Sequence, residues 1–531
     1  YMNRYYVVEG NKRVSVLKYF KADSIVANVT RKIPKYSEDE DVKLYYEYMK
    51  FNQISGLNNI EFSKIGMVDK LLALMGSTAI WDADTRMEFN SLVNHFTKAY
   101  EFRGGRKLPI RVGDALTAFI NVYGYNTVLG MSDDELSLNI VKCWNEFVML
   151  TEKQSVGLVM DPLAAEERKG RNIFSYFMPS SAKKFTVAFL YPKSPDTSDW
   201  IYAHDLGRNY LEETFPDQMK TICVNDVTEE RTEQVLNDVI RQGADIIFEV
   251  APQMMKDSLK VAVDHPDVKI LNCSLNTSHK YIRTYYARMY EAKFLSGMIA
   301  GALAENDRIA YIADYPIYGM IANINAFALG ASFTNPRARI YLAWSTSENY
   351  DRERFLKDNN IQVVSDQDMI TPRDPGRQFG LYECSEDGRK LNLVMPLWNW
   401  GVFYEKMIQS ILAGSYQSEE NSEGRALNYW WGMSAGVIDL ICSKNVPTGV
   451  KRLVDHLKSD IKKGDIVPFY GEIRAQDGTL KNKKDKAMKP EAIMEMDWLT
   501  DNVIGEIPTM GELRAEARPV VQIKGVEEKM K

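Results

Sequence analysis

In the second part of the chain, hydrophobic residues follow two patterns in turn: continuous apolar runs, typical of buried strands, and apolar residues at helical spacing. The run Phe185–Tyr191 is continuously apolar, which is typical of a strand buried on both faces of a parallel sheet. A polar loop, Pro192–Asp199, comes next, and either Ser198 or Asp199 is placed to cap a helix. The helix is predicted by apolar residues at helical spacing: Trp200, Tyr202, Ala203, Leu206 and Tyr210. This order places the loop at the carboxyl end of a sheet, where open α/β sheets bind ligands.

The same alternation continues beyond this first unit. Further strands are predicted at Thr221–Val224, Asp245–Val250, Val268–Cys273, Arg308–Ala313, Arg339–Trp344, Gln362–Val364 and Asn392–Pro396. Helices are predicted at Glu229–Gln242, Gln253–Asp264, Tyr290–Ala304, Ile317–Thr334, Glu353–Asp358 and Phe403–Ala413. One sheet rarely holds so many strands, so the pattern predicts two α/β lobes with parallel sheets and crossover helices. We expect the loops after Tyr191, Val250 and Ala313 to line a cleft between the lobes.

The first part of the chain has a different pattern. Residues 40–150 lack the period of strands and carry helical faces, most clearly at Ser132–Leu150, where Ser132 and Glu135 form a capping box. The segment Asp161–Lys184 has the composition of a linker. The sequence therefore predicts a mainly helical domain at 1–180, a two-lobe module at 185–475, and a C-terminal extension at 476–531 packed on that module.

The first 20 residues contain one further motif. Residues 4–9 alternate as in a strand, Gly10 follows, and Lys12 and Arg13 begin a short helix. Backbone N–H groups and basic side chains at such a turn favour an anion. The piece at 4–20 resembles the Gly-x-x-Arg element of ParB-like domains, which implies a phosphate or nucleic-acid contact by Lys12 and Arg13. A plain strand–turn–helix with two solvated basic residues is the alternative.

Composition narrows the class of protein. A chain of 531 residues is too long to fold around one hydrophobic core, so several domains are expected. Its net charge of −6 gives no reason to expect non-specific nucleic-acid binding by the whole chain. The five cysteines are scattered without metal-ligand spacing, so we expect neither a metal site nor a disulfide scaffold. No run of about 18 apolar residues is present. The chain starts at Tyr1 rather than Met, so the lack of a visible signal peptide is weak evidence on localisation.

Several ordered motifs resemble one family. They are Gly243-Ala244-Asp245 before a strand, His265-Pro266-Asp267-Val268-Lys269 before the next, and the helix Glu291–Gly301, with Glu-x-x-Phe-Leu-x-Gly-x-x-Ala-Gly. In this order they resemble the basic membrane protein (PnrA-like) family of substrate-binding proteins, whose members include purine-nucleoside receptors. The resemblance covers roughly residues 185–475. It implies a periplasmic-binding-protein-like fold of type I, in which two α/β lobes close over a ligand.

The resemblance also implies a binding site. An Asp-x-Ser-Phe-like element of the family corresponds to Asp196, Ser198, Asp199 and Trp200, which makes Trp200 the residue expected to stack on a planar ligand; packing of Trp200 on the sheet is the alternative. Two aspartates of the family correspond here to Tyr191 and Tyr382, and a lysine falls near Trp398. Asp366 and Asp368 are candidate replacements for the carboxylates. Further aromatic residues expected at the site are Tyr315 and Trp400. Such a site suits a flat ligand with few polar groups.

Three classes of function follow from these observations. An enzyme is disfavoured, because no Ser, Cys or His has partners at informative spacing, and no cofactor is expected. The N-terminal domain favours a cytoplasmic sensor of a nucleoside-like or other planar solute, with a DNA or nucleotide contact as its output. The alternative is an extracytoplasmic, membrane-anchored component of an ABC-type nucleoside transporter, with the membrane subunits as partners.

Overall fold

The computed structural model describes residues 6–20, 22, 25–77, 79–151, 156–162, 184–275, 279–373, 376–385, 388–416 and 426–526. The chain divides into two compact units, at 1–153 and 154–531. The segment predicted as a linker, with a boundary near Ser180, lies largely outside the described residues. The division recorded in the structure comes earlier in the chain, at Lys153.

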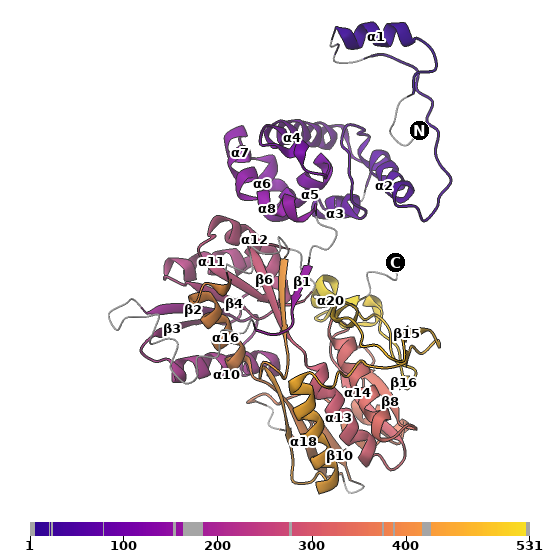
Figure 1. The fold of residues 1–531 in the computed structure, drawn as a ribbon. Coiled ribbons are helices and arrows are strands. Elements are labelled where there is room, and N and C mark those ends of the chain that lie inside the picture. Colours follow the sequence, from indigo (N-terminus) through magenta and orange to yellow (C-terminus); the bar gives the residue numbers. More distant parts are fainter. Residues whose placement is uncertain are drawn as a thin grey trace. The chain divides into compact units, whose positions relative to one another are not determined.

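The first unit is helical (Figure 1). Its core surrounds α5 (Val112–Tyr123), in which nine of the twelve residues are buried because the helix is apolar almost all round. Asp114 is buried at the start of α5 and accepts hydrogen bonds from the Ser63 and Arg111 N–H groups at 2.9 Å. The helices of this unit are α2 (Glu40–Ser55), α3 (Met67–Leu74), α4 (Ala83–Phe102), η1 (Gly105–Lys107), α5, α6 (Tyr125–Leu129), α7 (Asp133–Lys142) and α8 (Trp144–Met149).

Two predictions for this unit are changed by the structure. The capping box of Ser132 and Glu135 is confirmed at the start of α7, but the helix predicted over Ser132–Leu150 breaks at Cys143 into α7 and α8. The strand predicted at 4–9 is wrong for Tyr6–Glu9, which are exposed and lie in no strand, and α1 (Asn11–Tyr19) buries no residue. The structure therefore does not show the ParB-like element. A strand needs a neighbouring strand to pair with, and Tyr6–Glu9 pair with none among the described residues.

The first lobe of the second unit is a fully parallel sheet (Figure 1). Its strand order is β1-β12-β6-β5-β4-β2-β3. The strands are β1 (Val156–Val159), β2 (Phe185–Leu190), β3 (Met219–Val224), β4 (Ile246–Glu249), β5 (Lys269–Cys273), β6 (Ile282–Ala287) and β12 (Ala426–Trp431). The helices are α10 (Asp199–Thr214), η2 (Glu229–Arg231), α11 (Thr232–Arg241), η3 (Pro252–Met254), α12 (Met255–Asp264) and α16 (Trp400–Leu412).

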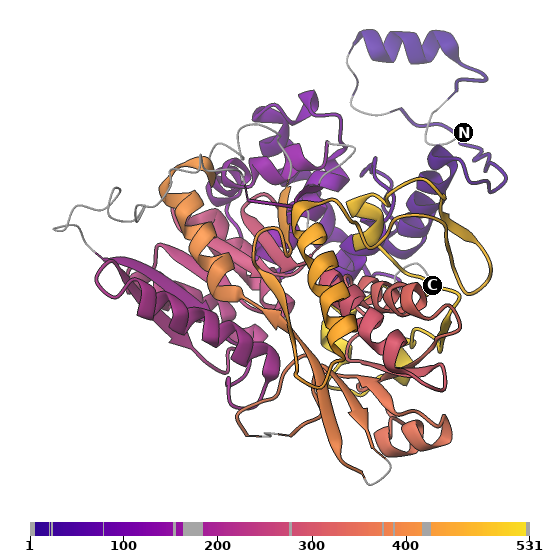
Figure 2. The same cartoon turned by 60° about the horizontal axis from the view of Figure 1, so that its bottom comes forward.

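The second lobe is built on a mixed sheet, seen from two directions in Figures 1 and 2. Its order is β13-β11-β10-β9-β7-β8-β16, with β10 and β11 antiparallel to their neighbours. The strands are β7 (Arg308–Ala313), β8 (Arg339–Trp344), β9 (Val363–Ser365), β10 (Leu381–Cys384), β11 (Lys390–Trp398), β13 (Ile438–Cys442) and β16 (Val503–Ile504). The helices are α13 (Tyr290–Leu303), α14 (Met320–Thr334), α15 (Arg352–Asp358), α18 (Thr448–Lys463), α19 (Pro490–Met494), η4 (Met510–Glu512) and α20 (Arg518–Lys524), and β14 (Ile473–Arg474) pairs with β15 (Leu480–Asn482) as a hairpin.

Helices α13 and α14 pack with their backbones in contact. A Cβ atom added to Gly297 would lie 2.0 Å from the carbonyl oxygen of Phe327, and one added to Gly330 would lie 2.0 Å from that of Phe294. Larger side chains at these two positions would push the helices apart. Glycine is therefore needed at Gly297 in the predicted helix Tyr290–Ala304, because it lets α14 approach closely.

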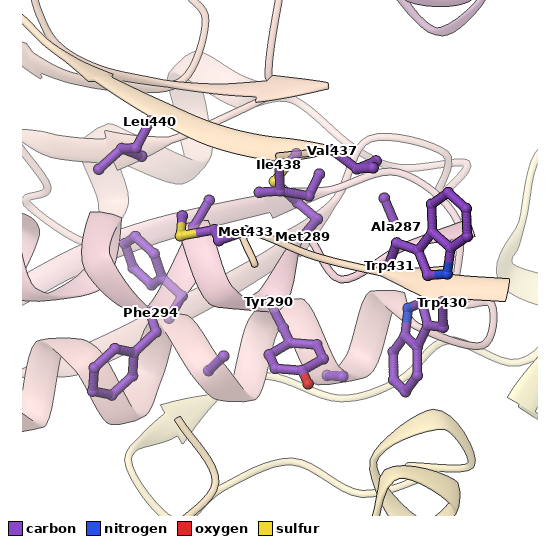
Figure 3. Packing of buried hydrophobic residues seen from close by; sticks show 14 of the residues in the cluster. Ala287, Met289, Tyr290, Phe294, Trp430, Trp431, Met433, Val437, Ile438 and Leu440 are labelled. Atoms are coloured by element: carbon purple, nitrogen blue, oxygen red, sulfur yellow. The ribbon is translucent and has the colours of Figure 1, made fainter. Parts of the chain in front are cut away.

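The chain passes between the lobes after β6, after β11 and after β12. Arg288 lies at the first crossing and ties the crossing after β12 to it. Its Nε donates to Glu291 Oε1 at 2.6 Å, its Nη1 to the Trp430 carbonyl at 2.9 Å, and its Nη2 to Ser434 Oγ at 3.1 Å. Buried rings and aliphatic side chains surround these crossings (Figure 3), with Tyr290 and Trp430 5.5 Å apart. These three crossings form the hinge of the two-lobed fold.

The first segment of the second unit adds a strand to the sheet of the first lobe, and its last segment adds a strand to the sheet of the second lobe. Strand β1 pairs in parallel with β12, and the residues that follow it reach the hinge, where Arg288 donates to the Met160 carbonyl and lies 3.5 Å from Asp161. At the other end, β16 pairs with β8, and Trp344 Nε1 donates to the Glu506 carbonyl at 2.8 Å. The C-terminal segment therefore forms part of the second lobe.

Candidate ligand-binding site

The loops that follow β2 and β4 in the first lobe, and β7 and β9 in the second, meet at the junction of the lobes. Ser198 caps α10 as predicted, accepting a hydrogen bond from the Ile201 N–H at 3.4 Å. This places Asp199 and Trp200 in the first turn of α10, directly after the first predicted strand. Trp200 Nε1 donates to the Val250 carbonyl at 2.8 Å, which fixes the indole against the loop after β4.

Three partly buried rings lie together at this junction: Trp200, Tyr286 and Trp398, called here the aromatic group. Trp200 stacks on Tyr286 with ring centroids 5.8 Å apart and 28° between planes. Trp398, at the end of β11, meets Trp200 edge-on at 5.2 Å and Tyr286 at 5.8 Å. The aromatic group combines residues from both lobes, which suits recognition of a flat ring.

One ion pair of the second lobe lies next to the aromatic group, and a second one involves another aspartate of the same loop after β9. Lys293 Nζ lies 2.5 Å from Asp368 Oδ1, and Trp398 Nε1 donates to Asp368 Oδ2 at 3.3 Å. Burial, the largest single cause, lowers the pKa of Lys293, but the charge of Asp368, the hydrogen bond to it and the effects of Tyr311 and Asp366 together outweigh burial, and the pKa of Lys293 is raised. Arg352 Nη2 lies 2.9 Å from Asp366 Oδ2. Each of these carboxylates therefore has its own cation.

Among the residues that the structure describes, two further carboxylates at the junction, Asp199 and Asp314, form no ion pair of their own, although the charges of Lys293 and Arg352 act on Asp314. Burial, followed by the charges of Asp314 and Asp368, raises the pKa of Asp199 to about 6. Burial also raises the pKa of Asp314, which accepts a hydrogen bond from Ser345 Oγ. Asp199 belongs to the first lobe and Asp314 to the loop after β7 in the second, so the two lobes bring these like charges near each other.

Three of the predicted site residues lie in the cores of the lobes instead. Tyr191 is fully buried and its hydroxyl donates to Asp205 at 3.3 Å. Tyr382 is buried among Ala310, Ile312 and Val364, with its hydroxyl 3.2 Å from Asp366. Trp400 is 1% exposed and stacks on His204 at 4.3 Å. Large rings fill the interior at these positions. Of the three, Trp400 also contacts the aromatic group, because its ring centroid lies 5.5 Å from that of Trp398 and 5.7 Å from that of Trp200.

The remaining predicted residues lie around the junction. Asp196 is exposed in the loop before α10 and lies 3.8 Å from Arg373 of the second lobe. Tyr315 is partly buried and packs against Leu513, Ala517 and Val521 of the C-terminal segment. In the first unit, Lys12 and Arg13 lie on α1. Their predicted contact with an anion stays a prediction.

Sequence reasoning missed Tyr286, Lys293, Asp314 and Arg352. Lys293 was hidden inside an otherwise apolar helix pattern, although a lone lysine among buried positions is itself a signal of a charged partner. Asp314 directly follows a predicted strand, which is the position at which parallel sheets present polar residues. Within the described ranges, no group of His, Cys, Asp or Glu has an arrangement that would hold a metal ion, and no helix is both long and apolar enough to cross a bilayer.

Comparison with known proteins agrees with this geometry. Residues 184–372 match the family described as ABC transporter substrate-binding protein, PnrA-like. The C-terminal part of the chain contains a PnrA-like substrate-binding domain. The match is to a family of ligand-binding proteins and not to an enzyme family, which confirms the prediction that this domain is non-catalytic.

Individual relatives of the PnrA-like domain extend beyond the matched range. A purine-binding protein of Brucella abortus is 27% identical over 339 residues, which are 61% of this chain and 95% of the relative. A putative ABC transporter glucose-binding protein of Haloferax volcanii is 24% identical over 62% of this chain and 83% of the relative. Among solved structures, an ABC transporter solute-binding protein from Conexibacter woesei matches with a TM-score of 0.41 and 16% identity, covering 53% of this chain and 98% of that one.

Proposed function

We propose that the PnrA-like domain binds a purine-like planar heterocycle at the junction of its lobes and serves as the substrate-binding component of an ABC-type transporter. The observation that carries this proposal is the aromatic group, three rings from both lobes that are only partly buried. Core rings of the same protein, such as Trp400, are almost fully enclosed. Partial exposure at a hinge-flanked junction leaves ring surface for a ligand.

Two further observations support a heterocycle over a sugar. The relative from Brucella abortus is named for purine binding. In addition, the two positions where the family resemblance leads us to expect ribose-holding aspartates are Tyr191 and Tyr382, and both are buried in lobe cores. A ligand with few hydroxyl groups, such as a free base, fits this composition better than a nucleoside or a glucose-like solute.

The test is a pair of tryptophan substitutions measured in two ways. Trp200→Ala should weaken binding of adenine by about 1–3 kcal/mol, taking base–aromatic stacking as the scale, which is roughly tenfold to a hundredfold in Kd. Trp400→Ala should instead lower the free energy of unfolding by about 3–5 kcal/mol, because it empties a core position. Calorimetric titration and denaturant unfolding are run on both variants, with Trp200→Phe as the control that keeps a ring.

Opposite results would contradict the assignment. If Trp200→Ala destabilises the protein as much as Trp400→Ala and leaves the Kd unchanged, Trp200 is a packing residue. If the wild-type chain binds neither adenine, hypoxanthine nor adenosine, the ligand belongs to another class and the transport proposal loses its main support.

A second candidate function is a sensor whose first unit responds to ligand. The specific observation in its favour is β1, which follows the first unit directly, pairs with hinge-adjacent β12, and reaches Arg288 through Met160 and Asp161. Hydrogen exchange of residues 156–161, measured in the full chain with and without adenine, tests it. Unchanged exchange across this segment on saturation with ligand would count against a signal to the first unit.

A further inference from the structure

Three polar side chains form a chain of hydrogen bonds at the carboxyl end of the first-lobe sheet. Glu249 ends β4, Asn272 lies in β5, and Ser274 follows β5. Glu249 and Asn272 are fully buried, and Ser274 is 5% exposed. Asn272 Nδ2 donates to Glu249 Oε2 at 2.8 Å, and Ser274 Oγ donates to Asn272 Oδ1 at 2.8 Å. Buried polar groups that are bonded in this way are fixed in orientation as well as in place.

The order of donors and acceptors leaves one capacity open at the end of this chain. The Asn272 amide has two N–H hydrogens, and both are used, since Nδ2 also donates to the Ala251 carbonyl at 3.0 Å. The amide oxygen therefore accepts, and the single hydrogen of the Ser274 hydroxyl is directed to it. Among the described residues, no group donates a hydrogen bond to the Ser274 hydroxyl in return. Ser274 thus presents lone pairs only and can accept, but not donate, a further hydrogen bond.

Ser274 lies beside two members of the aromatic group. Strand β5 is between β4 and β6 in the sheet. A carbonyl in the loop after β4 holds Trp200, and β6 carries Tyr286. Cys273 pairs with Tyr285, so the next residues along the two strands are Ser274 and Tyr286. Since Trp200 and Tyr286 stack with centroids 5.8 Å apart, the sheet edge that holds Ser274 adjoins the rings on which we expect the ligand to lie.

We propose that Ser274 determines ligand specificity by accepting a hydrogen bond from an N–H group at the edge of the bound heterocycle. This inference rests on the proposed function of the domain. The class of ligand it names is a purine-like ring with a free ring N–H or amino group at that edge. A carbonyl oxygen in the same place would face an acceptor and is disfavoured. Asn272 and Glu249 are positioning residues, because they act on the ligand only through Ser274.

A purely structural role explains only part of this chain. Asn272 ties the loop after β4 to β5, because it binds the Ala251 carbonyl and the Glu249 side chain at once. The other oxygen of Glu249 has Ser258 as its partner. These contacts account for Glu249 and Asn272 without Ser274. A serine that served only a turn would bond to nearby backbone, whereas the Ser274 hydroxyl bonds to a side chain and keeps its acceptor side open.

Four bases test the inference on the full chain. Purine lacks the amino group of adenine, 7-deazaadenine has a carbon in place of nitrogen 7, and 9-deazaadenine has a carbon in place of nitrogen 9. Each analogue therefore removes one N–H position without adding bulk. In calorimetric titrations, we expect one of these analogues to bind the wild type about tenfold more weakly than adenine, the scale of one hydrogen bond whose acceptor is left unpaired. In Ser274→Ala, adenine should lose that advantage and bind within about twofold of the same analogue.

Two controls separate recognition from stability. Ser296→Ala removes another buried serine, which donates to the Ala292 carbonyl within α13 at 2.9 Å, and should leave the Kd ratios of the four bases unchanged. Glu249→Gln retains a side-chain oxygen for Asn272 and should keep the preference for adenine. Glu249→Leu takes that acceptor away, which frees the Asn272 amide to turn, and should reduce the preference to about twofold. A role in stability alone would change the unfolding of these variants without changing the ratios between ligands.

The possible failures are distinguishable. If the wild type binds none of the four bases, the proposed function fails. If it binds adenine and all three analogues equally well, or if Ser274→Ala keeps the wild-type ratios, the domain still binds purines and the assignment of Ser274 is overturned. If Glu249→Leu folds and keeps the ratios, Glu249 is not a positioning residue. Should Glu249→Leu fail to fold, the comparison of Ser274→Ala with Ser296→Ala still decides the specificity claim.

Discussion

Glu249 and Asp199 of the first lobe are held differently from Asp366 and Asp368 of the second lobe. In the first lobe, Glu249 is fully buried at the end of β4 with Ser258 and Asn272 as its neutral partners, and Asp199 also lacks a cation. In the second lobe, Asp366 and Asp368 are each joined to a basic side chain. A carboxylate with neutral partners responds to pH, whereas an ion-paired carboxylate responds to loss of its partner.

The first lobe holds most of the aromatic group, and Asp199 lies next to Trp200 at the start of α10. In the second lobe, Lys293 and Asp368 form a buried ion pair, and Trp398 donates a hydrogen bond to Asp368. These three residues fix one another and are called here the electrostatic frame. This frame fixes Trp398, the member of the aromatic group that belongs to the second lobe.

The largest effect is expected from breaking that frame. Lys293→Met leaves Asp368 partly buried without its cation and should lower the free energy of unfolding by about 3–5 kcal/mol, measured by denaturant titration at neutral pH. Lys293→Met combined with Asp368→Asn removes both charges and should recover a large part of the loss. If the single variant is as stable as wild type, the second lobe does not depend on this pair.

A smaller effect is expected from the buried carboxylate of the first lobe. Burial raises the pKa of Glu249 to about 7, although Ser258 and Asn272 oppose the shift. The folded state therefore keeps a proton that the unfolded state loses above about pH 4.3, so this group's contribution is full at acid pH and falls by about 3 kcal/mol as the pH rises to about 7.

The matched variant for this group is Glu249→Gln, which keeps the shape without the charge. Unfolding measured at several pH values between about 4.5 and 8 should show a flatter profile for the variant than for wild type. Glu233→Gln, at an exposed ion pair in the same lobe, should leave the wild-type profile in place. Equal slopes for wild type and Glu249→Gln would contradict the assigned cause.

The smallest effect concerns an exposed ion pair between the lobes. Asp196 and Arg373 are 3.8 Å apart with side chains 58% and 70% exposed. Arg373→Ala should change stability by less than about 1 kcal/mol, and the difference should vanish at about 1 M salt, because solvent and ions screen exposed pairs. A loss that persists at high salt would show that the arginine has a packing role.

Local patterns predicted much of the fold of the second unit. Continuous apolar runs such as Phe185–Tyr191 fall on strands, and the Asp477-Gly478 turn joins the hairpin of β14 and β15. Strand β6 was missed because Ile282–Ala287 carries Arg283 and Thr284 at its centre. The structure buries both, with Arg283 donating to the Tyr429 hydroxyl at 2.5 Å and to the Tyr416 carbonyl at 2.7 Å. The residues that satisfy Arg283 lie more than 100 residues away in the sequence. The segment Ile282–Ala287 therefore looks polar in the sequence, although it is a buried strand in the structure.

The site was less accessible to sequence reasoning. A local motif identified Asp199 and Trp200, because strand, loop and helix lie next to each other in the chain. The meeting of Trp200 with Trp398, and of Lys293 with Asp368, depends on how three crossings bring the lobes together. The hydrophobic periodicity of the sequence does not show which of these distant residues come into contact. For the same reason the sequence did not reveal that Tyr191 and Trp400 are almost fully buried.

The pairing of β1 with β12 has a consequence for biosynthesis. Residues 156–159 find their strand partner only at 426–431, so the ribosome must complete some 270 further residues before β1 has anywhere to add. Until then the backbone groups of this short strand have no strand partner, while β2 and β4 pair with nearby segments as they emerge. The hinge is thus among the last regions of the protein to assemble, and a chain truncated before Ala426 would keep an exposed edge on β6 that invites association with other nascent chains.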